Sequence, residues 1–164
     1  LGTMGFEVPA AMGAAVARPD MTVWSIAGDG GFQMTLAELA TIVEQRLPIK
    51  FAILNNNSLG MVRQLQDLFY DGVRVATAYS GNPDFVKLAE AYGIWAIRVS
   101  DPALVRDAID RANAVDGPTL IDFEIAPEEN VYPHLPAGGT ASEMIEGPAE
   151  PIGTSKKEAP AWLS

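Results

Sequence analysis

Two short stretches decide how this sequence folds. Thr22–Ala27 (TVWSIA) runs into Gly28–Gly30 (GDG), and Ile49–Leu54 (IKFAIL) runs into Asn55–Asn57 (NNN). Each is an apolar run of strand length that ends in turn residues, which predicts a buried strand. Between them, Thr35–Glu38 has the pattern of a capping box before a run with helical periodicity. Strand, helix and strand in this order predict parallel pairing, so both polar turns should lie at one edge of the sheet.

The same alternation continues on both sides of these stretches. Short connections between the elements favour an α/β fold, a doubly wound, mostly parallel sheet with helices on both faces. Further helices are expected at Val8–Arg18 and Gly60–Tyr70, from Asn82–Asp84 to Gly93, and after a cap at Asp101 with Pro102; further strands are expected at Trp95–Val99 and Thr119–Ile125.

Composition changes near residue 127. Residues 1–126 carry the alternating pattern and predict one α/β domain, whereas residues 127–164 are rich in Pro, Gly and Glu and predict an extended arm with a flexible tail. His134, the one histidine, lies in this arm and is expected to be structural or exposed. The chain opens on Leu1 instead of Met, and we expect it to be part of a longer polypeptide.

Charge and composition exclude several classes of function. The 164 residues carry a formal net charge of −10, which disfavours nucleic-acid binding because such proteins need a basic surface. The chain has no cysteine, so no disulfide framework or thiolate metal site is expected. No apolar run approaches the ~20 residues of a membrane span, and no signal peptide is recognisable at the start. We expect a cytoplasmic protein.

The two polar turns together predict a site for a metal ion and an anion. Carboxylate and amide oxygens, as at Asp29 and Asn56, are hard ligands that suit Mg²⁺, which completes its shell with phosphate and water. The glycines beside Asp29 permit a diphosphate to approach the backbone, and a helix starting near Thr35 would favour its charge. Alone, a Gly-Asp-Gly is usually only a turn; the two turns at this spacing, each after an apolar strand, are more specific.

The pair of turns resembles the thiamine diphosphate (TPP) binding motif, which begins Gly-Asp-Gly and ends Asn-Asn. Similarity to the acetolactate synthase (acetohydroxyacid synthase) family extends over about residues 1–146. The segments that carry it are LGTMGF (1–6), FQMTL (32–36), LGMVRQ (59–64), NPDF with LAEAYG (82–93) and PEENVYP (127–133).

This resemblance implies roles for individual residues. Asp29 and Asn56 would bind Mg²⁺ through their side chains, and Ser58 through its backbone carbonyl. Met4 would support the bend of the cofactor, although a plain core methionine is the simpler interpretation without the resemblance. The full set of implied cofactor-binding residues is Gly2, Met4, Gly28, Asp29, Gly30, Gly31, Asn56, Ser58, Leu59, Gly60 and Met61.

The resemblance also implies a substrate-facing group on the predicted helix after Ser58. Met61, Gln64 and Leu65 are expected near the mouth of the substrate pocket. Leu65 departs from the family, in which a Trp helps to select 2-oxobutanoate and to bind herbicides, so weaker discrimination between 2-oxobutanoate and pyruvate is expected. Gly31 is a second departure, because a Ser is common there.

The family's activity is the decarboxylation of pyruvate and the ligation of the two-carbon unit to a second 2-oxoacid, in branched-chain amino acid biosynthesis. The glutamate that activates TPP belongs to a separate domain, so no catalytic residue is expected in this chain, and the chain alone should be inactive. Implied partners are the other domains, FAD in a middle domain, a homodimer or tetramer, and a regulatory subunit.

Three alternatives remain open from sequence. The first is another TPP carboligase or decarboxylase, such as glyoxylate carboligase, pyruvate oxidase or sulfoacetaldehyde acetyltransferase. The second is a non-catalytic α/β binding module, whose affinity for TPP would not require Mg²⁺. The third is a degenerate domain that binds nothing, against which the intact Asp29 and Asn56 argue.

Overall fold

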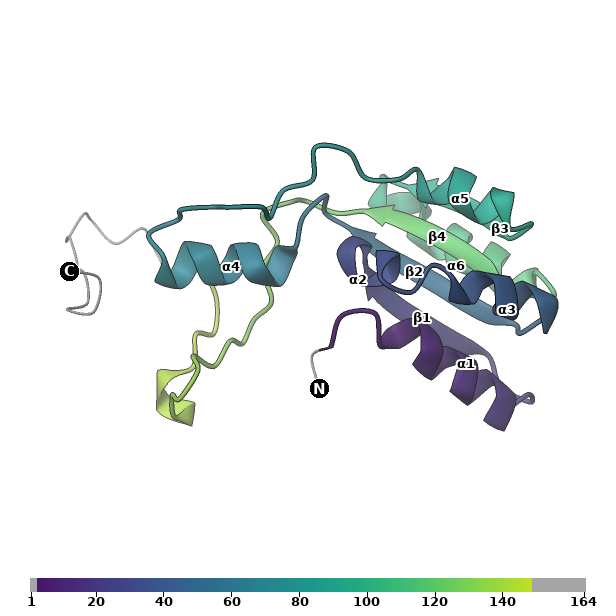
Figure 1. Ribbon diagram of the computed structural model, residues 1–164, viewed down its shortest axis with the longest axis horizontal. Coiled ribbons are helices and arrows are strands. Elements are labelled where there is room, and N and C mark those ends of the chain that lie inside the picture. The colour runs from purple at the N-terminus through teal and green to yellow at the C-terminus, as the bar shows by residue number, and fades with distance from the viewer. Residues whose placement is uncertain (1–2, 149–164) are drawn as a thin grey trace. The chain divides into compact units, whose positions relative to one another are not determined.

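The computed structural model describes residues 3–148, and within them one parallel sheet organises the chain (Figure 1). Its strands are β1 (Val23–Gly28), β2 (Ile49–Asn55), β3 (Trp95–Val99) and β4 (Thr119–Glu124), in the order β1-β2-β4-β3. Every neighbouring pair is parallel. The chain divides into two compact units, one ending at Glu129 and the next beginning at Asn130.

Helices cover both faces of the sheet, which confirms the doubly wound α/β fold. Helices α1 (Glu7–Ala17), α2 (Asp29–Gln33), α3 (Glu38–Glu44) and α5 (Phe85–Ala91) contribute to the larger core, on one face. Phe32, which contacts Phe51 and Phe85 edge to face, lies in this core. On the other face, α6 (Val105–Ala114), which follows a short 3₁₀ turn at Pro102–Leu104, packs over β3 and β4.

Local signals explain where the helices begin and end. The Asp84 side chain accepts a hydrogen bond from the Lys87 N–H and so caps α5, and Gly93, at φ +75°, follows the helix. Asp101 caps the Pro102 turn in the same way. These caps confirm the predicted helix starts, because each aspartate satisfies an N–H that the first helical turn leaves free.

The capping box predicted at Thr35 is wrong. Helix α3 begins at Glu38 after Ala37, with no side-chain cap, and the Thr35 hydroxyl is buried without a hydrogen-bond partner. The reason is that α2 continues into turns: the Thr35 N–H donates to the Phe32 carbonyl, so Thr35 is not the extended residue that precedes a helix. The helix that starts at the polar turn is therefore α2, which begins at Asp29.

Strand β1 is less buried than its apolar sequence predicts. It pairs with β2 on one side only within the described residues, and its Ile26 side chain is 65% exposed. Leu54 of β2, on the same face, is 40% exposed, because α6 packs over β3 and β4. The central strand β2 is otherwise buried, as predicted. The sheet thus has one covered half and one open half on this face.

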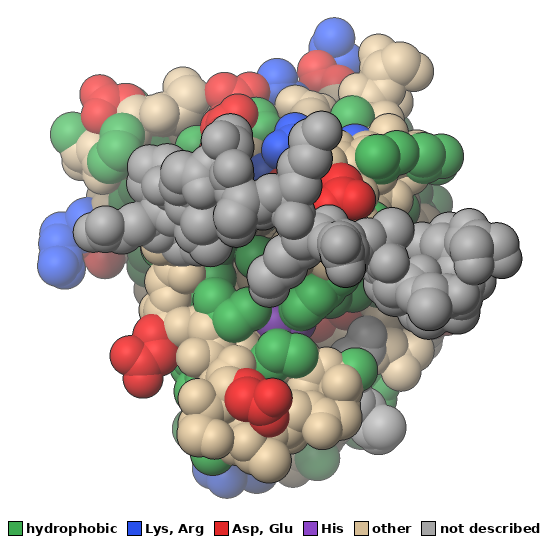
Figure 2. Space-filling view, turned by 90° about the vertical axis from the view of Figure 1, so that its left-hand side faces the viewer, with side chains coloured by type: hydrophobic (Ala, Val, Ile, Leu, Met, Phe, Trp, Pro, Cys, Tyr) green, Lys and Arg blue, Asp and Glu red, His purple; other side chains and the backbone are tan. Residues whose placement is uncertain are grey.

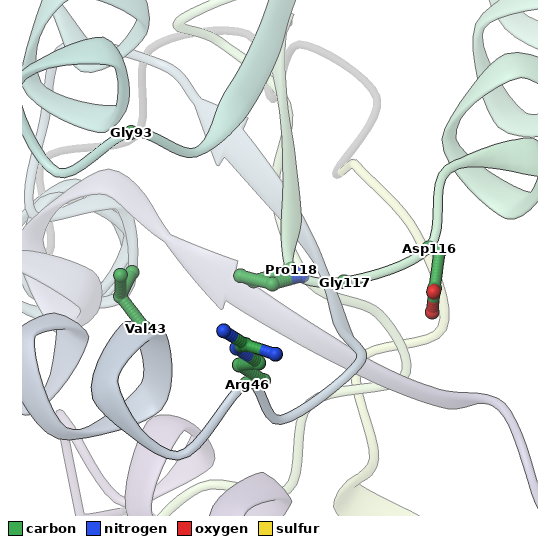
Figure 3. Close-up of a pocket in the computed structure, with 6 residues that line it drawn as sticks. All are labelled: Val43, Arg46, Gly93, Asp116, Gly117 and Pro118. Atoms are coloured by element: carbon green, nitrogen blue, oxygen red, sulfur yellow. The ribbon is translucent and has the colours of Figure 1, made fainter.

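A shallow pocket lies at the amino ends of the strands, lined by Val43, Arg46, Gly93, Asp116, Gly117 and Pro118 (Figure 3). Beside it, the ammonium group of buried Lys50 donates to the backbone carbonyls of Val115 (2.8 Å) and Gly117 (2.7 Å). None of the helices in residues 3–148 has the length and apolarity needed to cross a membrane.

The unit beginning at Asn130 contains little regular structure in its described part. His134 and Ile145 exchange two backbone hydrogen bonds in an antiparallel bridge. A 3₁₀ turn, Ala141–Glu143, is opened by a capping box between Thr140 and Glu143.

Candidate cofactor and cation site

The carboxyl ends of β1 and β2 bring the two polar turns together. Gly28 lies opposite Leu54 in the parallel register, so Asp29 and Asn55–Asn57 leave the sheet at the same edge. This confirms the placement expected from the strand order, since parallel strands end side by side.

Asp29 is a buried carboxylate held by neutral donors. It is 1% exposed; its Oδ1 accepts from the Gly30 N–H (3.0 Å) and its Oδ2 from the Asn82 side-chain amide (2.7 Å). Burial raises the pKa of Asp29, and hydrogen bonds from Asn82 and from the Gly30 and Ser58 N–H groups partly oppose that rise. No Lys or Arg in residues 3–148 pairs with it. A bound cation would therefore supply the missing positive charge.

The Asn55–Asn57 turn is fixed by its own side chains. Asn55 Oδ1 accepts from the Asn57 N–H (3.2 Å), where the backbone has a positive φ of 54°. Asn56 Oδ1 accepts from the Ser58 N–H (3.0 Å), and the Ser58 hydroxyl donates to the Thr77 carbonyl (2.8 Å). Because the Ser58 N–H also contacts the Asp29 carboxyl, Asp29, Asn56 and Ser58 converge on one point.

Glycines form a cradle beside Asp29. A Cβ atom at Gly30 would lie 2.5 Å from the Tyr79 hydroxyl, 2.8 Å from Leu59 Cδ2 and 3.3 Å from Met4 Cε, so these side chains surround Gly30. A Cβ at Gly28, by contrast, would meet nothing within 4 Å. A side chain at position 30 would therefore make Tyr79 and Leu59 shift.

Gly31 and Gly60 are also close to polar side chains. A Cβ at Gly60 would lie 2.6 Å from Asn56 Nδ2, and one at Gly31 would lie 2.9 Å from Glu7 Oε1. This carboxylate oxygen of Glu7 is buried and has no hydrogen-bond partner. The Ser that is common in the family at position 31 would not fit beside Glu7 without a shift.

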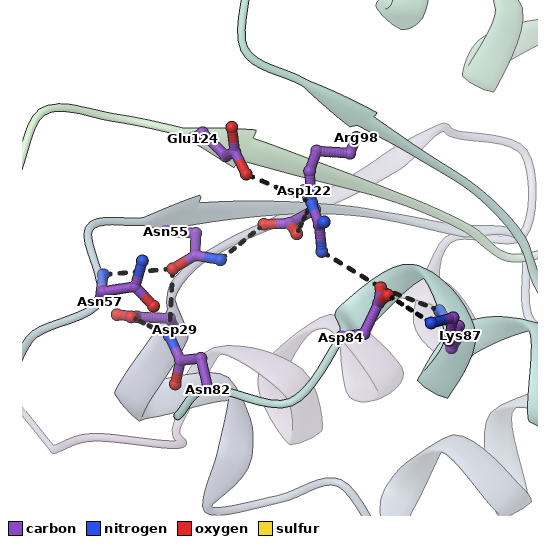
Figure 4. A network of polar contacts seen from close by, with 9 residues as sticks. All are labelled: Asp29, Asn55, Asn57, Asn82, Asp84, Lys87, Arg98, Asp122 and Glu124. Carbon is purple, nitrogen blue, oxygen red and sulfur yellow. Dashed lines mark hydrogen bonds and ion pairs between the residues drawn. The ribbon is translucent and has the colours of Figure 1, made fainter. Parts of the chain in front are cut away.

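A polar network that the sequence did not predict supports the site (Figure 4). The Asn82 amide donates hydrogen bonds to Asp29 and Asn55. The Asn55 amide in turn donates to the buried Asp122, which also accepts from Arg98. Asn82 was interpreted only as part of a helix start, and Asp122 as a strand residue. An Asp within a mostly apolar predicted strand, as at position 122, is the signal that would have identified part of this network.

The expected substrate-facing residues lie on α4 (Gly60–Phe69). Met61 is 48% and Leu65 37% exposed, whereas Gln64 is buried. Hydrophobic side chains reach the surface of the face seen in Figure 2. Gly2 lies outside the described residues, so its expected role is not addressed by the structure.

The residues at this edge fit a magnesium–diphosphate group in chemistry. One carboxylate, one amide oxygen and one backbone carbonyl are hard oxygen donors, and Mg²⁺ takes few protein ligands when phosphate is present. No group of three or more His, Cys, Asp or Glu suited to a metal occurs in the described residues. A cation here would thus depend on mixed donors and on the anion that it accompanies.

Comparisons with known proteins agree with this chemistry. The chain is 47% identical over 146 residues to acetolactate synthase isozyme 2 large subunit of Escherichia coli (strain K12), covering 89% of this chain and 27% of that protein. It is 48% identical over 149 residues to acetolactate synthase of Mycobacterium leprae (strain TN), covering 88% and 24%. The chain thus spans about a quarter of the length of these relatives.

A solved structure shares the fold. The thiamine diphosphate-dependent 4-hydroxybenzoylformate decarboxylase of Rhodococcus jostii RHA1 superposes with a TM-score of 0.68 at 34% identity, covering 75% of this chain and 23% of that one. Residues 1–123 match the family described as thiamine pyrophosphate enzyme, C-terminal TPP binding domain. The chain belongs to that family.

Proposed function

We propose that the edge formed by Asp29 and Asn55–Asn57 binds the diphosphate of TPP together with Mg²⁺. The observation that carries this proposal is the buried Asp29 carboxylate, which neutral donors surround and which pairs with no Lys or Arg among residues 3–148. In this proposal Asp29, Asn56 and the Ser58 carbonyl hold the cation. The remaining contacts to the cofactor come from Gly2, Met4, Gly28, Gly30, Gly31, Leu59, Gly60 and Met61.

The Gly30 N–H donates to Asp29 Oδ1, so in the first turn of α2 the Gly31 N–H is the group that would donate to the diphosphate, while Gly30 would let the cofactor approach the backbone. Met4 and Leu59 border Gly30 and would exclude water from the cofactor. When bound, TPP supplies a nucleophilic carbon for decarboxylation of a 2-oxoacid and transfer of the remaining unit.

We further propose that this chain is the cofactor domain of an acetolactate synthase that joins pyruvate to a second 2-oxoacid, pyruvate or 2-oxobutanoate. Identity of 47–48% to two acetolactate synthases supports this assignment. The activating glutamate, FAD, a homodimer or tetramer, a regulatory subunit and a cytoplasmic location belong to the same proposal, and the chain alone is expected to be inactive.

Calorimetric titration of TPP into this chain, with and without Mg²⁺, tests the binding proposal. We expect Mg²⁺-dependent binding, and we expect Asp29→Ala to abolish it, because a cation site loses its only carboxylate. Asp107→Ala is the matched control, since Asp107 is an exposed carboxylate on α6. Binding that survives Asp29→Ala, or a folded wild-type chain that binds no TPP with Mg²⁺, would contradict the proposal.

Leu65 provides a test of substrate choice. In a longer polypeptide that contains this chain, Leu65→Trp is expected to raise the share of product formed from 2-oxobutanoate when both acceptors compete. The reason is that an indole adds apolar contact area for the larger acceptor. An unchanged product ratio would show that Leu65 does not set the preference.

A further inference from the structure

We propose that Asn82 is a positioning residue of the cation site: its amide orients the Asp29 carboxylate for a metal ion without neutralising the negative charge. The inference rests on the proposed function, because it concerns how the chain prepares the same cation site. It is carried by the hydrogen bonds of one side chain that lies far from Asp29 in the sequence.

Both the nitrogen and the oxygen of the Asn82 amide have hydrogen-bond partners. Its Nδ2 donates to Asp29 Oδ2 (2.7 Å) and to Asn55 Oδ1 (3.1 Å), while its Oδ1 accepts from Gln33 Nε2 (3.0 Å). A flipped amide would turn its oxygen toward the carboxylate and lose both donations. The orientation of Asn82 is therefore determined by its partners, and it links the Gly28–Gly30 turn to the Asn55–Asn57 turn.

The far side of this link is itself held in place (Figure 4). Asn55 Nδ2 donates to Asp122 Oδ1 (3.0 Å), and Arg98 Nε donates to Asp122 Oδ2 (2.9 Å). Asp122 is fully buried in the central strand β4. Arg98 also pairs with Asp84 and Glu124, so its positive charge faces three carboxylates. The amides of Asn55 and Asn82, which are neutral, link Asp122 to Asp29.

All the groups in the described residues that donate to the Asp29 carboxylate are neutral. They are the Asn82 amide and the backbone N–H groups of Gly30, Ser58 and Asp29 itself. A Lys or Arg in place of Asn82 would also orient the carboxylate, but it would cancel the charge that attracts the metal. An amide orients Asp29 and leaves its charge available.

The fold supplies Asn82 from a well-anchored segment. It lies two residues before Asp84, which caps α5, and α5 is fixed in the core by fully buried Phe85. Tyr79, from the same segment, donates its N–H to the Asn57 carbonyl (3.0 Å). The short segment that carries Asn82 is therefore anchored on both sides, at Tyr79 and at Asp84–Phe85.

The test uses Mn²⁺ as the probe, because its binding is read directly by electron paramagnetic resonance without any catalytic assay. Cation affinity is measured at saturating TPP, and TPP affinity at saturating cation, for wild type, Asn82→Ala and Asn113→Ala. Asn113 is an exposed asparagine on α6 and serves as the matched control. Loss of a residue that orients a metal ligand typically weakens metal binding about 10–100-fold.

We expect Asn82→Ala to weaken Mn²⁺ binding by about that factor, with a much smaller change in TPP affinity at saturating cation, and Asn113→Ala to leave both unchanged. Equal Mn²⁺ affinity in wild type and Asn82→Ala would overturn the inference. So would an equal loss for TPP and for cation, because that pattern indicates general loosening of the segment. A wild-type chain that binds neither ligand would instead overturn the proposed function, and the inference with it.

A second variant separates orientation from simple space filling. Asn82→Asp has nearly the same shape but replaces the donor with a carboxylate beside Asp29. We expect a lower melting temperature without cation and a larger Mn²⁺-induced rise than in wild type, because two carboxylates repel until a cation binds. Melting temperatures like those of wild type, with and without Mn²⁺, would show that Asn82 only fills space.

Discussion

Each end of the sheet buries one charged side chain, and the groups that surround the charge differ between the two ends. At the amino end, Lys50 donates to two backbone carbonyls beside the pocket in Figure 3. At the carboxyl end, Asp29 accepts only from neutral groups and lies beside a glycine cradle. Burial lowers the pKa of Lys50 and raises that of Asp29, so both charges are held at a cost.

The difference teaches how to separate a structural charge from a site. Lys50 is 3% exposed, and its partners are backbone atoms of the turn before β4, so it ties that turn to β2. The negative charge of Asp116 also favours the charged form of Lys50. Asp29 is equally buried, but no Lys or Arg in residues 3–148 pairs with it. Burial alone does not distinguish Lys50 from Asp29. The charges of the groups that surround each side chain do.

Gly30→Ala should have the largest effect on the site. The added methyl group would lie against Tyr79 and Leu59 and occupy the cradle. We expect TPP affinity to fall about 100-fold, on the order of 3 kcal/mol, as for an overpacked buried position. Gly28→Ala is the control at the same turn, since its Cβ meets nothing within 4 Å. Calorimetric titration of TPP into both variants measures the difference. Similar TPP affinities for the two variants would show that the space beside Gly30 is not needed for cofactor binding.

Lys50→Met should damage the fold and spare the site. The two carbonyls that lose their donor are desolvated, at a cost of about 1–3 kcal/mol for each unsatisfied group. We expect the free energy of unfolding, measured in urea, to fall by about 2 kcal/mol. The TPP dissociation constant of the folded chain should not change. A weaker dissociation constant would mean that the two ends of the sheet are coupled.

Glu7→Gln should strengthen TPP binding. The buried Glu7 oxygen lies close to Gly31, where the diphosphate is proposed to bind, and like charges repel. Removing the charge is worth on the order of 1 kcal/mol at the effective dielectric of a partly buried site, so we expect affinity to rise about threefold to tenfold. Glu44→Gln, far along α3, provides the comparison. Weaker binding in Glu7→Gln would indicate that Glu7 instead helps to hold a cation.

The smallest effect concerns pH. Because burial raises the pKa of Asp29 above 3.8, the folded chain holds this proton more tightly than the unfolded chain. Stability from this group is therefore present below pH 3.8 and is lost as pH rises through the higher folded value. Without cations, Asp29→Asn should gain stability relative to wild type across this window. Urea unfolding at several pH values checks the sign, and a difference that stays constant with pH would contradict it.

The sequence was sufficient for the order of strands and helices. The parallel sheet, the edge shared by Asp29 and the Asn55–Asn57 turn, and the cap at Asp101 were predicted from periodicity and turn residues, which are local signals. The wrong capping box at Thr35 and the exposed face of Ile26 came from tertiary context: α2 continues into turns, and β1 is an edge strand.

The supporting network was beyond sequence reasoning for a physical reason. Helices α3 and α4, strand β2 and a long connection separate Asn82 from the turn of Asp29, so only the folded chain shows that the two residues meet. The same holds for Glu7 and Gly31, whose closeness depends on how α1 meets α2. Roles of single residues were implied by family resemblance, which said nothing of the side chains that orient them.

The open flank of β1 has a practical consequence for any work with this chain by itself. Among residues 3–148, no strand pairs with the outer side of β1, and Ile26 on this strand is 65% exposed. Such an edge is a template for intermolecular strand addition. Concentrated samples of the isolated chain should therefore lengthen the sheet from one molecule into the next and precipitate. A charged residue at position 26, such as Ile26→Lys, should delay this aggregation in light-scattering experiments, because such gatekeepers oppose edge-to-edge stacking.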